Sequence, residues 1–590
     1  MSVLETPRLY FRGKTTWDPI VTNNASQQYD EDDSKTVFGT GATGTVAAFR
    51  KAAIAAVTGG GNWNPAGTHR SVFYETTVVG VDVGNGLSKA DPIVDCPVSF
   101  AGMLVDLEPY GAFTSQLFFD AMSFGIQGGC RVFAPRLTRM TARYINFARN
   151  TTYGGGNAPA GGASVVWQTC FPKGRGGLVL DPHHSGVIAQ FEKMLQDDDV
   201  LGLTVRWNAY FTRYFDTSDI AKIPALAQQL QANLSGGGFQ PNPARSELVG
   251  VLGLWRKGEP ICEPGDRALL TVDSNTVASA HARLSTNSLT LDLSNSIPET
   301  DLNLTKQNLG DITAFAVAPD GHSVVATLGT FNYSSYNRDA YNATAGILTL
   351  QVDPDAAEKA KTADLQLRRA DGTVLFAETA LRAIADRGNI YLDEDETTTL
   401  QVQVLDRGRP AGAGINVAMA DFTSSAGTTT TQPTDGQGIA SFPLSGNAGQ
   451  IEGYALLPGN GVLTQFDQQI NTYVYVRTRP ADSNIGSMQA SWDNVHKFVL
   501  RNWQAMAPCM DNWLDLGNPD QVKAFGPMLR QLTDKANFES FRFMPVTRDM
   551  TAGERSLLYA FLGTPAAMAE AAAKVHRPSA LELGRALRGG

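Results

Sequence analysis

The dense succession of short strand-like runs between residues 71 and 265 constrains the fold of this chain more than any other feature. SVFYETTVVGVDV, ASVVWQTCF and VLGLTVRWNAYF are rich in Val, Phe, Tyr, Trp and Thr, and Gly, Pro and Asn punctuate the sequence between them. Such residues favour a pleated, half-buried surface, and the separators supply turns. The pattern predicts a β-rich N-terminal domain over residues 1–265, with short helices near 186–196 and 218–234.

The period of the apolar residues divides the remaining chain into three further segments. Short strand-like runs continue through 266–390, which we assign to a second β-rich module. Alternating segments with turns at DRGRP and TDGQG predict an immunoglobulin-like β-sandwich over 391–482. From 483 the period becomes 3.6, which predicts a helical C-terminal domain over 483–590. The expected fold class is therefore α+β, predominantly β and multidomain.

The balance of charges limits the partners that suit this chain. It has 48 Lys and Arg against 58 Asp and Glu, a net charge of −10, which argues against binding to nucleic acid or to an anionic membrane. No apolar run approaches the roughly 20 residues that span a bilayer, and the first residues lack the order of a secretory signal. The five cysteines form no CxxC pair, which argues against a zinc site and a disulfide framework. We therefore expect a cytoplasmic protein.

The densest polar cluster of the sequence ends in three consecutive carboxylates. Asp197, Asp198 and Asp199 lie where the helix predicted near 186–196 ends and a strand begins. Three carboxylates at one turn suit a hard cation such as Ca²⁺, although their spacing lacks the alternation of a calcium loop. A metal site and a solvated turn are both consistent with this pattern.

His496 is the histidine whose surroundings in the sequence point most directly to chemistry. It lies inside the amphipathic segment ASWDNVHKFVLRNWQAM, one turn from Leu500 and two from Trp503. An imidazole in an apolar cleft can ligate haem iron or move a proton. A helical histidine at the edge of a core can also be a hydrogen-bonded structural residue, and the sequence leaves both roles open.

Arg548 is the cation that we single out, in the segment FRFMPVTRDMTAGERSLLYAFL. Here Thr551 and Glu554 have the spacing of a capping box, which predicts the start of a helix. A guanidinium before such a helix can hold a substrate carboxylate through two hydrogen bonds. It can equally tie the helical domain to an internal carboxylate. The sequence has no GxSxG, HExxH or P-loop motif, which narrows the enzyme classes open to it.

Four blocks of the sequence resemble a known family of biosynthetic proteins. PRLYFRG (7–13), LQDDDVLGLTV (195–205), ELVGVLGLWRKGE (247–259) and FMPVTRDMTAGERSLLYAFL (543–562) look like the amino-terminal half of the VioB and chromopyrrolate synthase family. Members of that family couple two imines of indole-3-pyruvate, which a flavin amino-acid oxidase makes, so the resemblance implies a protein of secondary metabolism. Members of that family are described as haem proteins. Their carboxy-terminal half is a ferritin-like helical domain, and this sequence lacks its paired Glu and Glu-x-x-His helices.

The resemblance leaves two functions to be weighed. In the first, the chain is a haem-dependent oxidase or peroxidase acting on amino-acid-derived imines, with His496 as the expected haem ligand and Arg548 or Arg542 holding the substrate carboxylate. In the second, it is a non-catalytic scaffold or partner subunit for a separate ferritin-like or oxidase protein. A surface or carbohydrate-binding protein is a third hypothesis, which rests on the β-rich content and is disfavoured by the missing signal peptide.

Overall fold

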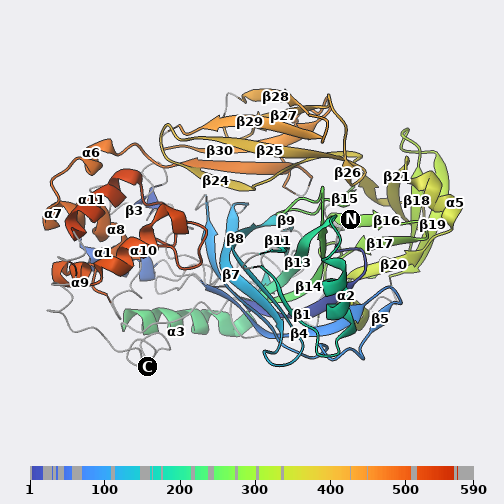
Figure 1. Ribbon diagram of the computed structural model, residues 1–590, viewed down its shortest axis with the longest axis horizontal. Coiled ribbons are helices and arrows are strands. Elements are labelled where there is room, and N and C mark those ends of the chain that lie inside the picture. The colour runs from blue at the N-terminus through green and yellow to red at the C-terminus, as the bar shows by residue number, and fades with distance from the viewer. Residues whose placement is uncertain are drawn as a thin grey trace.

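The computed structural model shows a predominantly β protein with helices at the C-terminal end of the chain (Figure 1). The predicted class, α+β and predominantly β with several modules, is confirmed. The structure describes residues 3–17, 29–30, 35–36, 45–55, 70–107, 113–146, 160–161, 164–174, 177–213, 220–236, 245–272, 277–299, 304–333, 338–424, 427–447, 449–468, 470–506, 514–563 and 568.

The N-terminal strands form one twelve-stranded antiparallel sheet that curls back toward itself. Its strands are β1 (Arg8–Thr16), β4 (Arg70–Asp82), β5 (Leu87–Ser88), β6 (Val98–Asp106), β7 (Ser115–Gly125), β8 (Arg131–Thr141), β9 (Arg143–Asn146), β10 (Ala160–Gly161), β11 (Ser164–Pro172), β12 (Val179–Asp181), β13 (Val200–Arg213) and β14 (Arg245–Arg256). The hydrogen-bonded path runs β12-β8-β7-β6-β4-β1-β14-β13-β11-β9. β8 is second from one end of this path and β9 is the other end, yet the two strands follow one another directly in the chain. β8 also contacts β11, so the two sides of the sheet approach one another.

The interior of this curved sheet is filled by alternate side chains. Leu203, Val205, Trp207 and Ala209 alternate along β13 and all belong to one buried cluster, as the two-residue period of a strand requires. Trp207 stacks on Trp167 of β11, with 5.8 Å between the ring centroids. The helix α2 (Gly186–Met194) adds buried side chains to this cluster, and the Ser185 side chain accepts a hydrogen bond from Ile188 N at its start.

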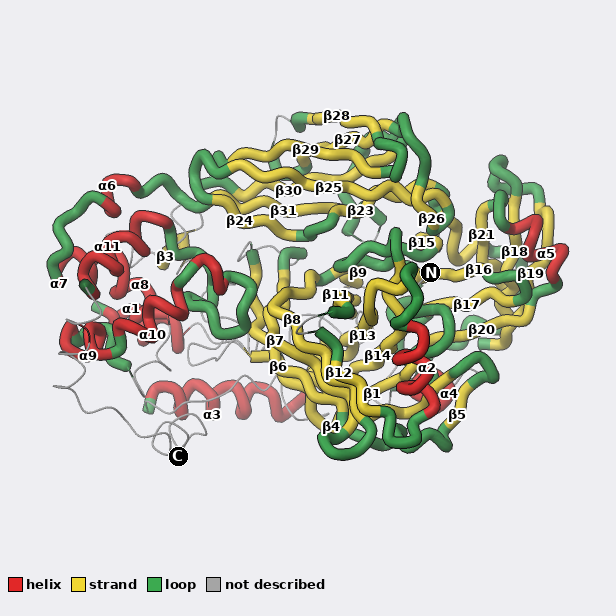
Figure 2. The backbone as a smooth tube through the Cα atoms, viewed as in Figure 1, coloured by secondary structure: helices red, strands yellow, loops and turns green. Residues whose placement is uncertain are grey.

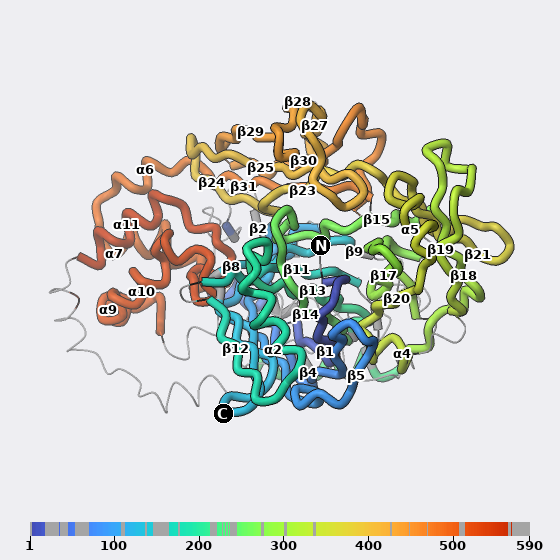
Figure 3. Tube along the Cα trace, turned by 45° about the vertical axis from the view of Figure 1, so that its right-hand side comes forward, coloured from blue at the N-terminus to red at the C-terminus, as the bar shows by residue number. Residues whose placement is uncertain are grey.

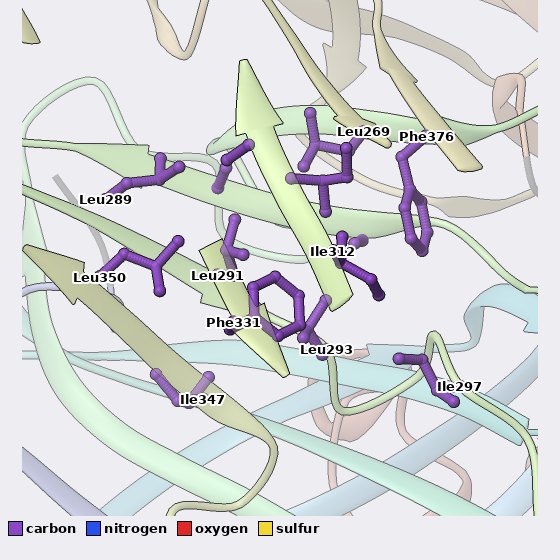
Figure 4. Packing of buried hydrophobic residues seen from close by; sticks show 14 of the residues in the cluster. Leu269, Leu289, Leu291, Leu293, Ile297, Ile312, Phe331, Ile347, Leu350 and Phe376 are labelled. Atoms are coloured by element: carbon purple, nitrogen blue, oxygen red, sulfur yellow. The ribbon is translucent and has the colours of Figure 1, made fainter. Parts of the chain in front are cut away.

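A second, eight-stranded sheet packs against β1, β13 and β14. Its strands are β15 (Arg267–Thr271), β16 (Ala280–Leu284), β17 (Ser288–Asp292), β18 (Asp311–Val317), β19 (Val324–Asn332), β20 (Ile347–Gln351), β21 (Asp364–Arg369) and β22 (Val374–Glu378), accompanied by α4 (Arg338–Ala343) and α5 (Pro354–Ala360). Leu291, Ile312 and Phe376 meet in its core (Figure 4). Tyr10 and Val249 of the first sheet belong to the same cluster, so the two sheets share one core.

The next segment is a β-sandwich of two sheets, at the top of Figure 2. One sheet contains β23 (Leu381–Ala385), β25 (Thr397–Asp406), β26 (Arg409–Pro410) and β29 (Ile439–Ser445). The other contains β24 (Asn389–Leu392), β27 (Asn416–Asp421), β28 (Thr429–Pro433), β30 (Ile451–Pro458) and β31 (Thr472–Thr478). Leu400, Phe442 and Val474 lie in the buried layer between the sheets, as expected for face-to-face packing.

The C-terminal helices form a compact group at the left of Figures 1 and 3, and they share a buried cluster with β6 and β7. They are α6 (Ser483–Gly486), α7 (Trp492–Val495), a π-helical turn (His496–Leu500), α8 (Arg501–Met506), α9 (Pro519–Ala524), α10 (Gly526–Thr533), a 3₁₀ turn (Lys535–Asn537) and α11 (Ala552–Leu562). Thr551 and Glu554 form the predicted capping box at the start of α11. Met103, Val105 and Phe118 of the first sheet belong to the core of these helices.

A few short elements complete the described chain. They are β2 (Tyr29–Asp30), β3 (Lys35–Thr36), α1 (Val46–Ala55), α3 (Ile223–Ser235) and a 3₁₀ turn (Ile220–Lys222). Helix α1 contacts both α8 and α3. Apart from Met568, a further helix that we predict over 565–573 lies outside the described residues. In the described part of the chain, no helix has the length and apolar character needed to cross a membrane.

Candidate functional site

The three consecutive carboxylates occupy an exposed turn between α2 and β13. Asp197 Oδ1 accepts a hydrogen bond from the Asp199 backbone N at 3.0 Å, which lowers the pKa of Asp197. Its other oxygen lies 3.5 Å from Arg256, and Asp199 lies 3.5 Å from Lys257. Asp198 is exposed. Among the residues that the structure describes, no three His, Cys, Asp or Glu side chains are grouped to hold a metal ion. A metal role for these aspartates therefore stays a prediction.

His496 begins the π-helical turn and is half-buried. Its ring stacks on Trp492 at 5.3 Å between centroids, and its Nε2 lies 3.1 Å from Gln504 Oε1. Because an amide oxygen only accepts hydrogen bonds, the contact fits the tautomer with the proton on Nε2. Ligation of haem iron by Nε2 would require that atom to lose both this proton and Gln504, so the geometry at His496 does not fit a ready haem ligand. Haem binding stays a prediction.

Arg548 is buried, with 1% of its surface exposed. Its guanidinium lies over the Phe118 ring at 3.6 Å and donates to the backbone oxygens of Val546 at 2.6 Å and Ser540 at 2.8 Å. Burial lowers its pKa to about 9. No carboxylate is paired with Arg548 within the described ranges. The residue thus ties the helices to β7 through an aromatic ring and carbonyls. Arg542, in contrast, is largely exposed beside Asp120.

A buried cluster of charged residues, which we call the polar junction, joins the first sheet, the second sheet and the sandwich. Its centre is Glu263, which is 2% exposed. Glu263 accepts from Arg143 Nε at 3.1 Å, from the Tyr144 hydroxyl at 2.9 Å and from Arg382 at 3.2 Å. Arg143 and Tyr144 belong to β9, whereas Arg382 belongs to β23 of the sandwich. The carboxylate of Glu263 therefore connects the first sheet to the sandwich.

The other half of the polar junction is built around Arg206 of β13. Its guanidinium donates to Asp266 at 2.8 Å and to Asp292 of β17 at 3.0 Å, while its Nε donates to Gln168 at 2.9 Å. Gln168 donates in turn to the Glu263 backbone oxygen at 2.9 Å. The two halves thus form one network, in which three arginines face three carboxylates. Buried charges of this kind are tolerated because each is paired and hydrogen-bonded.

The polar junction also contains a buried histidine, His281 of β16. Its ring lies edge-on to Tyr144, with 4.7 Å between the centroids, and it is 4% exposed. Burial, followed by the charges of Arg206 and Arg382, holds the pKa of His281 well below its ordinary value of 6.5. The imidazole is therefore neutral at physiological pH. Within the described residues its Nε2 has no hydrogen-bond partner.

Backbone geometry accommodates the polar junction at two positions. Tyr144 has a φ of +50°, a left-handed conformation that is uncommon for a residue with a bulky side chain. Gly388 leaves room for Arg143, because a Cβ atom at that glycine would lie 2.1 Å from the guanidinium. Arg143 passes this point to donate to the Tyr473 backbone oxygen of β31 at 3.0 Å. Backbone conformation as well as ion pairing therefore fixes the network. Such a network can hold the modules in one relative position, and we call this role the lock.

An open groove of about 640 Å³ lies beside α2, on the same side as the three aspartates. It is lined by Lys173, Gly174, Leu178, Val179, Leu180, Glu192, Leu195 and Gln196. Lys173 Nζ donates to the backbone oxygens of Leu195 at 3.0 Å and Asp197 at 2.8 Å, at the end of α2. Sequence patterns single out the aspartates next to this groove but neither the groove nor the polar junction, whose members are isolated polar residues in strands.

Comparisons with known proteins add no functional site. No protein-family model and no curated protein matches this chain. The α-2-macroglobulin of Salmonella, reacted with methylamine, is 10% identical over 64% of this chain and 24% of that protein, with a TM-score of 0.13. Trypsin-activated α-2-macroglobulin from Escherichia coli is 8% identical over 81% of this chain and 29% of that protein, with a TM-score of 0.13. The chain spans about a quarter of the length of these proteins, and similarities at this level support no conclusion about its fold or function.

Proposed function

We propose that this chain is a non-catalytic scaffold, a partner subunit for a separate oxidase or ferritin-like protein of secondary metabolism. The polar junction is the observation that carries the proposal. Its arginines and carboxylates form ion pairs with one another. These ion pairs hold the first sheet, the second sheet and the sandwich in a fixed arrangement. The class of partner comes from the resemblance of the sequence blocks to VioB and the chromopyrrolate synthases, which hold a ferritin-like domain in the same chain.

A scaffold must keep its modules in a constant arrangement, and the shared cores support this requirement. Domains of one chain normally move relative to one another unless their interface is large and apolar. Here the first and second sheets share one apolar cluster, and the C-terminal helices share another with β6 and β7. The arginine assigned to substrate binding, Arg548, is part of that second interface, because it lies over Phe118. These contacts favour a rigid body over a hinged enzyme.

The test of the scaffold is whether the chain forms a complex and whether it reacts alone. Sedimentation velocity would compare the purified chain with its mixtures with an amino-acid oxidase and a ferritin-like protein from the same genome. We expect a faster-sedimenting complex in at least one mixture, and no consumption of the oxidase-derived imine by the chain alone. A chain that stays monomeric in every mixture and converts the imine unaided would overturn the proposal.

A haem-dependent oxidase acting on amino-acid-derived imines is the second candidate. One feature favours it: the π-helical turn that starts at His496, because π-helical turns are enriched at functional sites. When bound, haem would supply one-electron and peroxide chemistry. The contribution of this chain would be the imidazole of His496, once released from Gln504, and the indole of Trp492 against which the ring packs.

The absorption spectrum of the purified protein after supply of hemin tests this candidate. A Soret band that is lost in His496→Ala and kept in Gln504→Ala would support ligation by His496. An unchanged spectrum of free hemin in all three proteins would remove the candidate.

A further inference from the structure

The groove beside α2 lies at a split in the first sheet. Strand β11 pairs with β13 as far as Pro172 and Gly202, and Lys173 N still donates to Leu201 O at 2.8 Å. Beyond Lys173, the segment that follows β11 separates from the segment that precedes β13. Among the described strands, β12 then pairs only with β8, from Val179 opposite Phe133 to Asp181 opposite Arg131. The groove is lined on one side by β12 and on the other by the end of α2.

This split leaves one edge of β12 without a strand partner in the described part of the chain. In an antiparallel pair, alternate residues direct their N–H and C=O groups away from the neighbouring strand. Such groups can pair with an added strand, and proteins usually protect an exposed edge with charge, proline or a covering element. In β12 the charged Asp181 and the following Pro182 lie at one end, whereas Val179 at the other end is apolar and 55% exposed. The end of this edge at Val179 therefore has the properties of a strand-addition site.

The polar groups of the groove indicate the charge of its occupant. Lys173 is one of its two charged lining residues, and its ammonium group is directed at the carbonyl oxygens of Leu195 and Asp197. The other is Glu192, whose carboxylate is exposed and has no ion pair among the described residues. Asp198, on the adjoining turn, is likewise exposed without an ion pair there. Cationic groups on an incoming chain can therefore pair with carboxylates that no side chain of the described residues neutralises.

We propose that the groove binds an extended segment of a partner protein, which adds a strand to β12 and carries basic residues alternating with apolar ones. The inference rests on the proposed scaffold function, because it names the kind of segment by which a partner is held. Main-chain hydrogen bonds to β12 supply affinity, the contact with Val179 selects the apolar residue, and Glu192 selects the basic one.

A short peptide of alternating Lys and Val, acetylated, amidated and fluorescently labelled, is the probe. Fluorescence anisotropy would measure its binding to the full-length protein at physiological salt. Two peptides of equal length serve as controls: one with Glu in place of Lys, and one with alternate backbone nitrogens methylated, which removes strand-pairing donors. We expect binding of the first peptide, and for each control an affinity weaker by about tenfold or more, equivalent to about 1.4 kcal/mol.

Protein variants localise the binding to the groove. Val179→Asp and Glu192→Lys change exposed side chains and are expected to weaken binding of the Lys peptide about tenfold, equivalent to about 1.4 kcal/mol. Val324→Asp is the matched control, because Val324 is also exposed at the terminal strand of a sheet, β19, and its variant should bind as the wild type does. Thermal midpoints equal to that of the wild type would show that the variants are folded.

Three results would overturn the inference. They are equal binding of the methylated peptide, equal binding by all variants, and absence of peptide binding with a small apolar dye bound in the groove instead. The first two would indicate attraction by the overall negative charge, and the third a small-molecule site. Peptide binding without any complex with the oxidase or ferritin-like protein would keep the groove and reject the proposed scaffold partner. A complex that forms without peptide binding, and that Val179→Asp leaves intact, would keep the scaffold and reject the groove.

Discussion

The buried histidine of the polar junction makes the stability of this protein depend on pH in a predictable direction. His281 is neutral in the folded protein because burial and the charges of Arg206 and Arg382 hold its pKa well below 6.5, with Asp266 opposing them. In the unfolded chain the same imidazole binds a proton below about pH 6.5. The unfolded state therefore binds more protons than the folded state as the pH falls, and the free energy of unfolding decreases.

The magnitude follows from the number of protons involved. One proton taken up only by the unfolded state costs about 1.4 kcal/mol of stability for each pH unit below its ordinary pKa. Between about pH 8 and about pH 5 the single imidazole of His281 should therefore remove about 2 kcal/mol. This stability is fully present above the unfolded pKa and is lost steadily below it, until the folded pKa is reached.

The assay compares wild type with His281→Gln, which keeps a polar side chain but cannot titrate. Urea unfolding followed by tryptophan fluorescence at several pH values gives the difference in stability between the two proteins, in which the other titrating groups cancel. We expect this difference to change in favour of the variant by about 2 kcal/mol between about pH 8 and about pH 5. Parallel pH profiles for the two proteins would refute a buried neutral His281.

Three further predictions concern the polar junction and the helices. Glu263→Gln should lower the free energy of unfolding by about 3–5 kcal/mol, because it leaves Arg143 and Arg382 buried without their carboxylate. Urea unfolding would measure this loss. A loss below about 1 kcal/mol would contradict the role of Glu263 in holding the modules together. Gly388→Ala should cost about 1–3 kcal/mol in the same assay, since its Cβ would meet the Arg143 guanidinium, and an unchanged midpoint would show that the guanidinium can move aside. Thr551→Ala should cost about 0.5–2 kcal/mol by loss of the α11 cap, measured against Ser556→Ala as an exposed control, and equal midpoints for these two variants would contradict the cap.

The elements of this fold could be predicted from sequence wherever their signal is local. The strand-like runs from 71 onward and the change of period at 483 report side-chain burial within one element, and both correspond to the observed structure. The cap at Ser185 and the capping box at Thr551 depend on residues three apart. Such patterns need no knowledge of the tertiary structure.

The polar junction could not be predicted, because its contacts join distant residues. Glu263 lies 120 residues from Arg143 and 119 residues from Arg382. A single arginine in a strand looks the same in sequence whether it faces solvent or a buried carboxylate. The carboxylates at 197–199 show the reverse case, because a conspicuous local pattern there forms a turn with ion pairs to Arg256 and Lys257.

The placement of Glu263 between two arginines has a consequence for how such a protein can change by gain or loss of a module. A chain from which residues 381–478 had been deleted would retain Glu263 with only one of its two cations, and Arg143 would lose the carbonyl of Tyr473. The deletion would also uncover apolar side chains of the remaining chain, Leu107 and Phe113, which pack against Tyr473 of the sandwich. The sandwich therefore cannot be gained or lost as an independent module. We expect a related chain that lacks it to have replaced Glu263 and Arg143 as well.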